Sequence, residues 1–287
     1  MTRRPPRHAH HAGPRIGLAL GGGGARGLAH IPILEAFDEL GLKPACIAGT
    51  SIGAIVGAAY ASGIPAAALR HYVLAAFRHR GEVLTRLWKL RYERFRDILA
   101  PSIGNPAQLK AESLLEAFLP EGVARDFAFL ETPFTAVATD FYAGKAVGIT
   151  SGPLRPAVAA SMAIPMMFRP VVIGEKVMID GGVTDPLPFG YVRKDVDLVV
   201  AVDVINRPKG EAPAVPSPYE AIFGATQILM QAVVAERLEH GQPDVLIRPN
   251  INLFRVLDFL KARAIIRAAD PAKDEMKRAL EKALKRF

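Results

Sequence analysis

The sequence predicts an α/β domain in which helices cover a mainly parallel sheet. Short apolar runs of strand length alternate with longer segments whose apolar residues recur at helical spacing. Strands that alternate with helices in this way normally lie parallel. The 287 residues, half of them hydrophobic, suffice for a sizeable core within one large domain or two smaller ones. This composition excludes a disordered chain.

The alternation begins near the N-terminus. Residues 16–20, IGLAL, predict a buried strand, and a glycine-rich turn follows it. The apolar residues of the next segment recur at helical spacing as far as Leu40. Residues 44–48 predict a second short strand, and residues 52–62 predict a helix of small residues. This order of strand, helix, strand and helix is the basis of the predicted parallel sheet.

The middle and C-terminal parts of the chain are less regular. Residues 66–131 show no strand pattern, and their aromatic and basic residues predict amphipathic helices around a loop at PSIGNPA. Beyond them we expect two hairpins, a buried strand and an exposed loop, over residues 134–141 with 145–150, 171–173 with 176–179, 198–204 and 206–218. We therefore expect one domain over residues 16–287, with a helical insertion at 66–131 and a helical C-terminal region at 219–287, after a disordered basic tail over residues 1–15.

The formal net charge of +8 is concentrated at the two ends of the sequence. Residues 1–15 carry four arginines and no acidic residue, and residues 251–287 carry ten basic residues against five acidic ones. The part between them is close to neutral, which argues against a basic nucleic-acid groove through the domain. We interpret the basic ends as solubilising, and a peripheral contact with an anionic membrane is the alternative.

Cysteine content and hydropathy indicate the cellular compartment in which we expect the protein. Cys46 is the single cysteine, so an intrachain disulfide is excluded and a reducing, cytoplasmic setting is expected. No stretch of about eighteen uninterrupted apolar residues predicts a membrane span. The basic N-terminal residues lack the apolar core and cleavage site of a secretory signal. We expect a cytoplasmic protein that is at most peripheral to the inner membrane.

A run of glycines, GGGGARG at residues 21–27, follows the first predicted strand and opens a helix. Glycines there free the backbone and leave N–H groups uncovered at a helix N-terminus, which favours negative charge. The run also contains the GxGxxG pattern of dinucleotide-binding folds, at Gly22, Gly24 and Gly27. That interpretation requires an acidic residue at the end of the second strand, about twenty residues further on. The sequence has Gly-Thr-Ser-Ile-Gly there, so the dinucleotide site is rejected.

The motif at that position is GxSxG, with Gly49, Ser51 and Gly53. Between a strand and a helix, this pattern is typical of a sharp turn that presents the serine hydroxyl as a nucleophile. Neighbouring parallel strands end at the same edge of a sheet, so we expect the glycine run and Ser51 to face each other. Backbone donors beside a nucleophile predict an acyl-transfer site. A simple helix N-cap is the alternative, and it explains Ser51 but neither Gly49 nor the upstream glycine run.

A serine nucleophile needs a base, and the sequence offers no well-placed histidine. His240 alone follows the candidate acids, and it lies at a predicted helix end, where a histidine normally faces solvent. Asp180, in MIDGGVTDPLP, comes at the end of an apolar strand and precedes two glycines that let the chain turn away. A carboxylate presented there takes the Ser51 proton directly if it lies within about 3 Å of Oγ. A plain turn is the alternative for the DGG sequence.

Four blocks of the sequence resemble, in order, the bacterial patatin-like phospholipase family. They are GGGARGLAHIPIL, GTSIGAIVGAAYASG, ASMAIPMMFRPV and DGGVTDPLP, within about residues 16–205. The resemblance implies a three-layer α/β/α fold with a mainly parallel central sheet. It also implies a serine lipid acyl hydrolase, whether phospholipase, lysophospholipase or carboxylesterase, that uses a serine–aspartate dyad carried by Ser51 and Asp180.

The resemblance further implies where the remaining parts of the site lie. An oxyanion hole would be formed by Gly22, Gly23 and Gly24, with Arg26 at the family's basic position. We expect Arg26 to support this loop rather than to meet a phosphate group. The ASxxxP block at residues 161–165 would be a structural loop near the site.

Two positions depart from the family's pattern. Pro32 stands where many relatives have a glycine, which should matter little early in a helix. Met166 and Met167 replace the small residues often found there, and they would add flexible apolar bulk to an acyl pocket.

Cofactors, partners and rival functions complete the expectations. No cofactor or metal is expected, because the sequence has no Cys, His and Asp cluster with ligand spacing. The expected partner is a lipid ester substrate, and no nucleic acid is expected. Two rivals remain: an acyltransferase that uses the same serine, and a catalytically weak regulator that keeps the fold and binds lipid.

Overall fold

The computed structural model of the protein describes residues 13–79, 81, 85, 109–205 and 215–287. The expected disordered tail as far as residue 12, the loop at PSIGNPA and residues 206–214 of the expected exposed loop lie outside the described residues.

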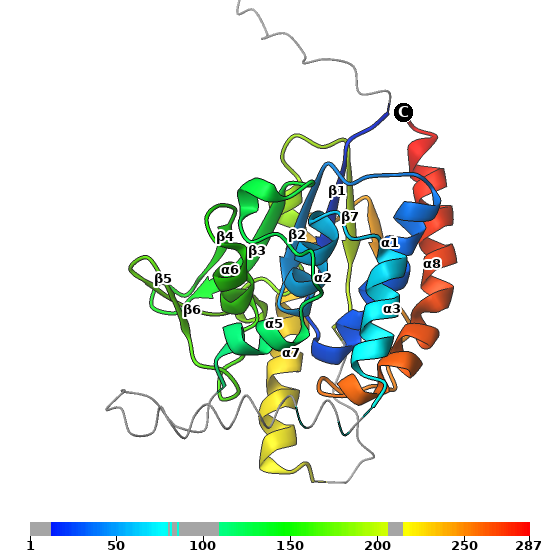
Figure 1. Ribbon diagram of the computed structural model, residues 1–287. Helices are drawn as coiled ribbons and strands as arrows, with labels where there is room; N and C mark the ends of the chain where they lie inside the picture. Colours follow the sequence, from blue (N-terminus) through cyan, green and yellow to red (C-terminus); the bar gives the residue numbers. More distant parts are fainter. Residues whose placement is uncertain (1–12, 80, 82–84, 86–108, 206–214) are drawn as a thin grey trace, which may run out of the picture.

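A mainly parallel sheet forms the centre of the protein (Figure 1). Its strand order is β5-β6-β3-β2-β1-β7-β8, and β4 pairs with β3. The pairs β1–β2, β1–β7, β2–β3 and β7–β8 are parallel, whereas β3–β4, β3–β6 and β5–β6 are antiparallel. The strands are β1 (Ile16–Leu20), β2 (Cys46–Thr50), β3 (Phe134–Asp140), β4 (Lys145–Ile149), β5 (Val171–Ile173), β6 (Lys176–Asp180), β7 (Leu198–Val202) and β8 (Val245–Ile247).

Helical segments cover both faces of the sheet. On one face, α1, α2, α3 and α8 pack around a large apolar cluster that includes Leu18 and Leu20 of β1. On the other face, α7 and the 3-10 segment η4 close over a smaller cluster around Ala19 and Ala48. These helices are α1 (His30–Glu39), α2 (Ile52–Ala61), α3 (Ala66–Ala76), α7 (Pro218–His240), η4 (Phe189–Val192) and α8 (Ala262–Leu284). The expected three-layer α/β/α fold is confirmed.

Several of the shorter helical segments flank the edge at which β1 and β2 end, whereas Phe127–Phe129 lies at the opposite edge, where the Phe127 ring stacks on Phe134 at the start of β3. The shorter segments are η1 (Gly24–Ala29), α5 (Ala111–Phe118), η2 (Phe127–Phe129), α6 (Leu154–Ser161), η3 (Gly181–Val183) and η5 (Phe259–Lys261). Glycine runs and short polar turns open several of them, because their backbone must bend immediately after a strand.

Three elements differ from the sequence-based expectation. β2 ends at Thr50 rather than at residue 48, because Gly49 and Thr50 still pair with β3. β8 was not expected, since its three residues carry too little alternation to distinguish a strand from a loop. α6 ends at Ser161 and occupies the start of the ASxxxP block, where a loop was expected; its Pro156 lies in the first turn, which a helix tolerates.

The basic C-terminal helix α8 belongs to the core. Its apolar face, which includes Ile265, Met276 and Leu280, is buried against α1. Lys273 and Lys277 on its outer side pair with Glu39 at the end of α1. The apolar face of α8 is therefore used in the core.

Two searches of the described residues gave negative results. None of the helices in those residues combines the length and the apolar character needed to cross a membrane. Among the same residues, no three His, Cys, Asp or Glu side chains gather closely enough to hold a metal ion.

Candidate active site

Ser51 lies in the sharp turn between β2 and α2. Its backbone has φ 56° and ψ −120°, a conformation that costs a residue with a side chain about 1–3 kcal/mol. The flanking glycines allow the turn, because a Cβ on Gly49 would overlap the backbone of Gly53, and a Cβ on Gly53 would overlap the carbonyl of Leu20. Strain of this kind persists only where the surroundings hold it, and it is typical of functional sites.

The hydroxyl of Ser161, at the end of α6, holds the strained turn in place. It accepts a hydrogen bond of 2.9 Å from the Ser51 N–H and donates one of 2.6 Å to the carbonyl of Val137 in β3. Ser161 is fully buried. The sequence marked this residue only as part of a loop near the site, whereas the structure makes it a direct support of Ser51.

Asp180 reaches Ser51 because two strands share one edge of β3. β2 pairs with β3 as far as Val137, and β6 pairs with it from Ala138 onward. β4 occupies the other edge of β3 over the same residues, so β6 continues the line of β2 beyond its end. Asp180 is opposite Ala138, one position from the partner of Thr50. The last residue of β6 therefore stands beside the turn that holds Ser51.

Burial and hydrogen bonding set the charge of Asp180. Burial raises the pKa of this carboxyl from its ordinary 3.8 to about 6, and the Ser51 hydroxyl and the Gly182 N–H oppose the shift. Oδ1 accepts a hydrogen bond of 2.7 Å from the Gly182 N–H, while buried Oδ2 makes no hydrogen bond of normal geometry with any described residue. The Ser51–Asp180 contact is thus close but still loose, as catalytic contacts without substrate commonly are.

The glycine run lies opposite this pair, since β1 and β2 are parallel neighbours in which Leu20 stands opposite Gly49. Its backbone donors are not equivalent. The Gly22 N–H donates to Pro186 O at 2.9 Å and is therefore already used, which contradicts its expected place among the oxyanion donors. Gly23 and Gly24 have no partner for their N–H groups among the described residues, and both line the pocket that contains Ser51 and Asp180.

Two buried side chains hold the carbonyls of the glycine run. Arg26, 2% exposed, donates from Nε to Gly23 O at 3.3 Å. His30, fully buried, contacts Gly21 O through Nε2 at 2.8 Å, so this nitrogen carries the proton. Burial lowers the pKa of His30 to about 4 and that of Arg26 to about 10, so His30 is neutral and Arg26 charged at neutral pH. Sequence reasoning missed His30, although its helical spacing from the glycine run was visible.

The segment after Asp180 is fixed from both sides. Thr50, directly before the nucleophile, donates to the carbonyl of Asp185 at 2.8 Å. Arg237 of α7 pairs with the Asp185 carboxylate at 2.9 Å and donates to Thr184 O at 3.2 Å. Burial raises the pKa of Asp185 to about 7, and Arg237 opposes that shift. His240, near the end of the same helix, is exposed and contacts its own helix carbonyl at Glu236, away from the site.

Two pockets meet at Ser51. One is an apolar cavity of about 420 Å³ between α2, α3 and α5, and Met167 is part of its lining. The other, about 60 Å³, contains Arg26 and Asp180 and is covered by α7. Met166, 53% exposed with φ 71°, turns away from the cavity, so one of the two unusual methionines adds apolar bulk there and the other does not.

Comparison with known proteins shows the family of the chain. Residues 18–193 match the family model described as patatin-like phospholipase. An uncharacterized NTE family protein of Mycobacterium tuberculosis is 39% identical over 200 residues, which cover 69% of this chain and 51% of that protein. A protein named lysophospholipase NTE1 from Yarrowia lipolytica is 27% identical over 90% of this chain and 19% of its own length. The chain thus spans about half the length, or less, of these curated relatives.

Two solved structures share the fold at low sequence identity. Human GIVD cytosolic phospholipase A2, in complex with methyl gamma-linolenyl fluorophosphonate, aligns with a TM-score of 0.52 at 14% identity, over 95% of this chain and 59% of that one. VipD from Legionella pneumophila aligns with a TM-score of 0.50 at 16% identity, over 94% of this chain and 67% of that one. The family model covers the glycine run, the GxSxG motif and the DGG sequence after β6. The chain therefore belongs to the patatin-like phospholipase family.

Proposed function

We propose that the protein hydrolyses carboxylic esters of lipids, with Ser51 as nucleophile and Asp180 as base. One observation carries the proposal: a serine held in a strained backbone conformation faces a buried carboxylate at the junction of an apolar cavity and unpaired backbone donors. Membership of the family supports it, as do the relative named lysophospholipase and the neighbour named phospholipase A2.

The first half of the reaction forms an acyl-enzyme. Ser51 Oγ attacks the ester carbonyl carbon, and its proton passes to Asp180 Oδ2, the carboxylate oxygen without a hydrogen-bond partner. The N–H groups of Gly23 and Gly24 hold the negative charge that develops on the carbonyl oxygen. When the tetrahedral intermediate collapses, Asp180 returns the proton to the leaving alcohol oxygen, and the acyl group remains on Ser51.

The second half releases the acid. Asp180 takes a proton from water, whose oxygen attacks the acyl carbonyl, and the same backbone donors hold the second oxyanion. Collapse returns the proton to Ser51 Oγ and frees the carboxylic acid. A base with a pKa of about 6 suits this cycle, because it is ionised at neutral pH and still accepts a proton readily.

The surrounding residues serve this chemistry through the backbone. Arg26 holds the carbonyl of Gly23, and because the C=O and N–H of a trans peptide point in opposite directions, this contact also orients the Gly24 N–H. His30 fixes the Gly21–Gly22 peptide in the same way. The charged Arg26 also adds a positive potential at the pocket where the oxyanion forms. We further propose that residues 16–287 act as one catalytic domain, because one apolar cluster includes residues from Ile16 to Ala283.

Probe labelling tests the nucleophile. A fluorophosphonate probe should label the wild type and Ser62→Ala, but not Ser51→Ala. Ser62 is the matched control, because it is a partly buried serine at the far end of α2. Equal labelling of Ser51→Ala and wild type would overturn the assignment of the nucleophile.

Turnover of phospholipid, lysophospholipid and soluble esters, measured side by side, tests the reaction. Free fatty acid should appear with the wild type and be lost in Ser51→Ala and Asp180→Asn. Acyl transfer to an added alcohol with little free acid would instead support the acyltransferase. Lipid binding with no turnover of any ester would support the regulator.

A further inference from the structure

The apolar cavity beside Ser51 follows one face of α2. Its lining includes Ser51, Ile52, Ile55, Val56 and Ala59. Residues with these spacings of three and four lie one above another on a helix. Because a helix rises 1.5 Å per residue, the cavity extends about 12 Å along α2 from the nucleophile to Ala59.

The far end of the cavity is closed. Ala59 near the end of α2 is 2% exposed, and Leu69 in the second turn of α3 is 4% exposed; both line the cavity. A connection of four residues, 62–65, joins the two helices and brings these positions together. Leu115 of α5, also 2% exposed, belongs to the same wall.

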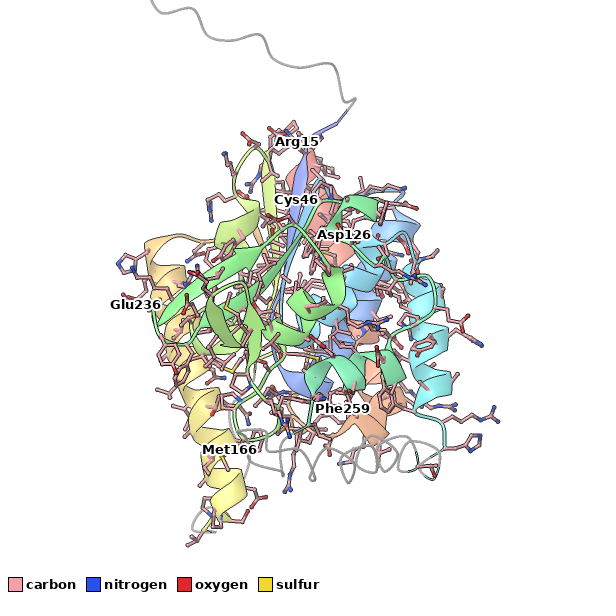
Figure 2. All side chains as sticks on the ribbon, turned by 60° about the vertical axis from the view of Figure 1, so that its left-hand side comes forward. Arg15, Cys46, Asp126, Met166, Glu236 and Phe259 are labelled. Carbon is pink, nitrogen blue, oxygen red and sulfur yellow. The ribbon has the colours of Figure 1, made fainter. Side chains whose placement is uncertain are left out.

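The near end lies at the edge of the sheet that carries the active site. There Phe77 stacks between Phe118 and Phe259, with ring centroids 5.7 and 5.9 Å apart. All three rings line the cavity and are partly exposed. Figure 2 shows Phe259 at the opposite end of the molecule from Arg15, which precedes β1. The cavity therefore opens beside the stacked rings and ends at Ala59.

The volume and lining indicate the chemical class of the occupant. Apart from Ser51, Gly24 and Tyr72, the lining residues are aliphatic, aromatic, proline or methionine. A fully extended acyl chain advances about 1.25 Å per carbon, so the distance of about 12 Å from Ser51 to Ala59 takes roughly ten carbons. The cavity volume of about 420 Å³ is ample for one chain of that length. The pocket on the other side of Ser51, about 60 Å³, has no room for a second such chain.

We propose that this cavity binds a single unbranched acyl chain of roughly ten carbons and that Ala59 sets the length of the chain. The carbonyl group lies at Ser51, the tail follows α2, and the alcohol part of the ester faces the small pocket under α7. This proposal deepens the proposed function and rests on it, because the chain enters as the acyl part of an ester at Ser51.

Ala59 determines the length because of its position and its size. A methyl group at the closed end leaves the last part of the cavity empty, and a leucine there would project about three further carbons into that space. Since the side chain enters an existing cavity rather than a packed core, Ala59→Leu should fold. Each methylene that loses its place should lower kcat/KM about fourfold.

Hydrolysis of a series of p-nitrophenyl esters, from acetate to stearate, tests the proposal. In the wild type, kcat/KM should rise with chain length and peak near decanoate. In Ala59→Leu, the peak should move about three carbons lower and the decanoate value fall about sixtyfold, while the acetate value stays within twofold. Ala68→Leu is the matched control, because Ala68 is exposed on α3 and does not line the cavity; its profile should equal that of the wild type.

Fatty-acid binding to the Ser51→Ala protein tests the cavity without hydrolysis. Displacement of a fluorescent fatty acid should give the tightest binding near decanoate for Ser51→Ala, and nearer heptanoate for Ser51→Ala combined with Ala59→Leu. An unchanged optimum in a folded Ala59→Leu protein overturns the proposal, whether or not esters are hydrolysed. If the binding optimum moves but the wild type hydrolyses no ester, the proposed function fails and the cavity assignment stands.

Discussion

Replacing Asp180 by asparagine should abolish hydrolysis and make the protein more stable. The buried carboxylate has one hydrogen bond of normal geometry, from the Gly182 N–H, and no cation is among the groups that lower its pKa. Asparagine keeps an oxygen that accepts this bond, has nearly the same shape and carries no charge. The fold is thus relieved of a buried charge that only catalysis requires.

The magnitude follows from the pKa of Asp180. A rise from 3.8 in the unfolded chain to about 6 in the folded protein corresponds to about 3 kcal/mol. Below pH 3.8 the carboxyl is protonated in both states and costs nothing. Between pH 3.8 and about 6 the folded state binds the additional proton, so stability falls as pH rises. Above about pH 6 both states are ionised and the full penalty remains.

Urea denaturation of wild type and Asp180→Asn, at several pH values from about 4 to 8, measures this effect. The variant should exceed the wild type by about 3 kcal/mol at the upper end of this range and by little at the lower end. Asp140→Asn is the control, because this buried carboxylate has Lys176 at 3.8 Å and should gain no stability. A gain for Asp180→Asn that does not change with pH, or a loss at pH 8, would falsify the charge argument.

Three further outcomes are expected. The kcat/KM of the wild type should fall tenfold per pH unit below about pH 6, where Asp180 becomes protonated. A stopped or spectrophotometric ester assay at several pH values measures this profile, and a flat profile excludes Asp180 as the base. Ser161→Ala should lower kcat at least tenfold with little change in KM, because the Ser51 N–H loses its hydrogen-bond acceptor. Steady-state kinetics measure both constants, and an unchanged kcat contradicts the role of Ser161 in supporting the Ser51 turn. Gly49→Ala should destabilise the protein by roughly 3 kcal/mol and lower its Tm by about five degrees, because the added Cβ overlaps the backbone of Gly53. A melting curve equal to that of the wild type would refute this expectation.

Much of the fold could be predicted from the sequence, because the signals are local. A fully apolar run such as residues 16–20 is buried on both faces, and this is what a central parallel strand requires. Gly174, with φ 60°, allows the tight turn that joins β5 and β6, as the two-residue spacing predicted. β8 was not predicted because three residues are too few to show an alternating hydrophobic pattern. Its position beside β7 is set only by the hydrogen bonds between the two strands.

For the candidate active site, the sequence by itself determined which types of residue occupy the key positions. The small residues around Ser51 and the acid before two glycines could be read directly, because a sharp turn and a strand end each demand particular residues. The sequence did not reveal which amides remain free. Pro186 O takes the Gly22 N–H, and this contact joins residues that are far apart in the chain.

Tertiary structure alone decided that Ser51 and Asp180 meet. The two residues lie side by side because β3 extends beyond the end of β2: it pairs with β2 up to Val137 and with β6 from Ala138. That register is fixed by pairing and packing between strands distant in sequence, and no local pattern encodes it. The same holds for the apolar cavity beside Ser51. Its length is the separation between Ser51 at one end of α2 and Ala59 at the other, and the helices that enclose it come together only on folding.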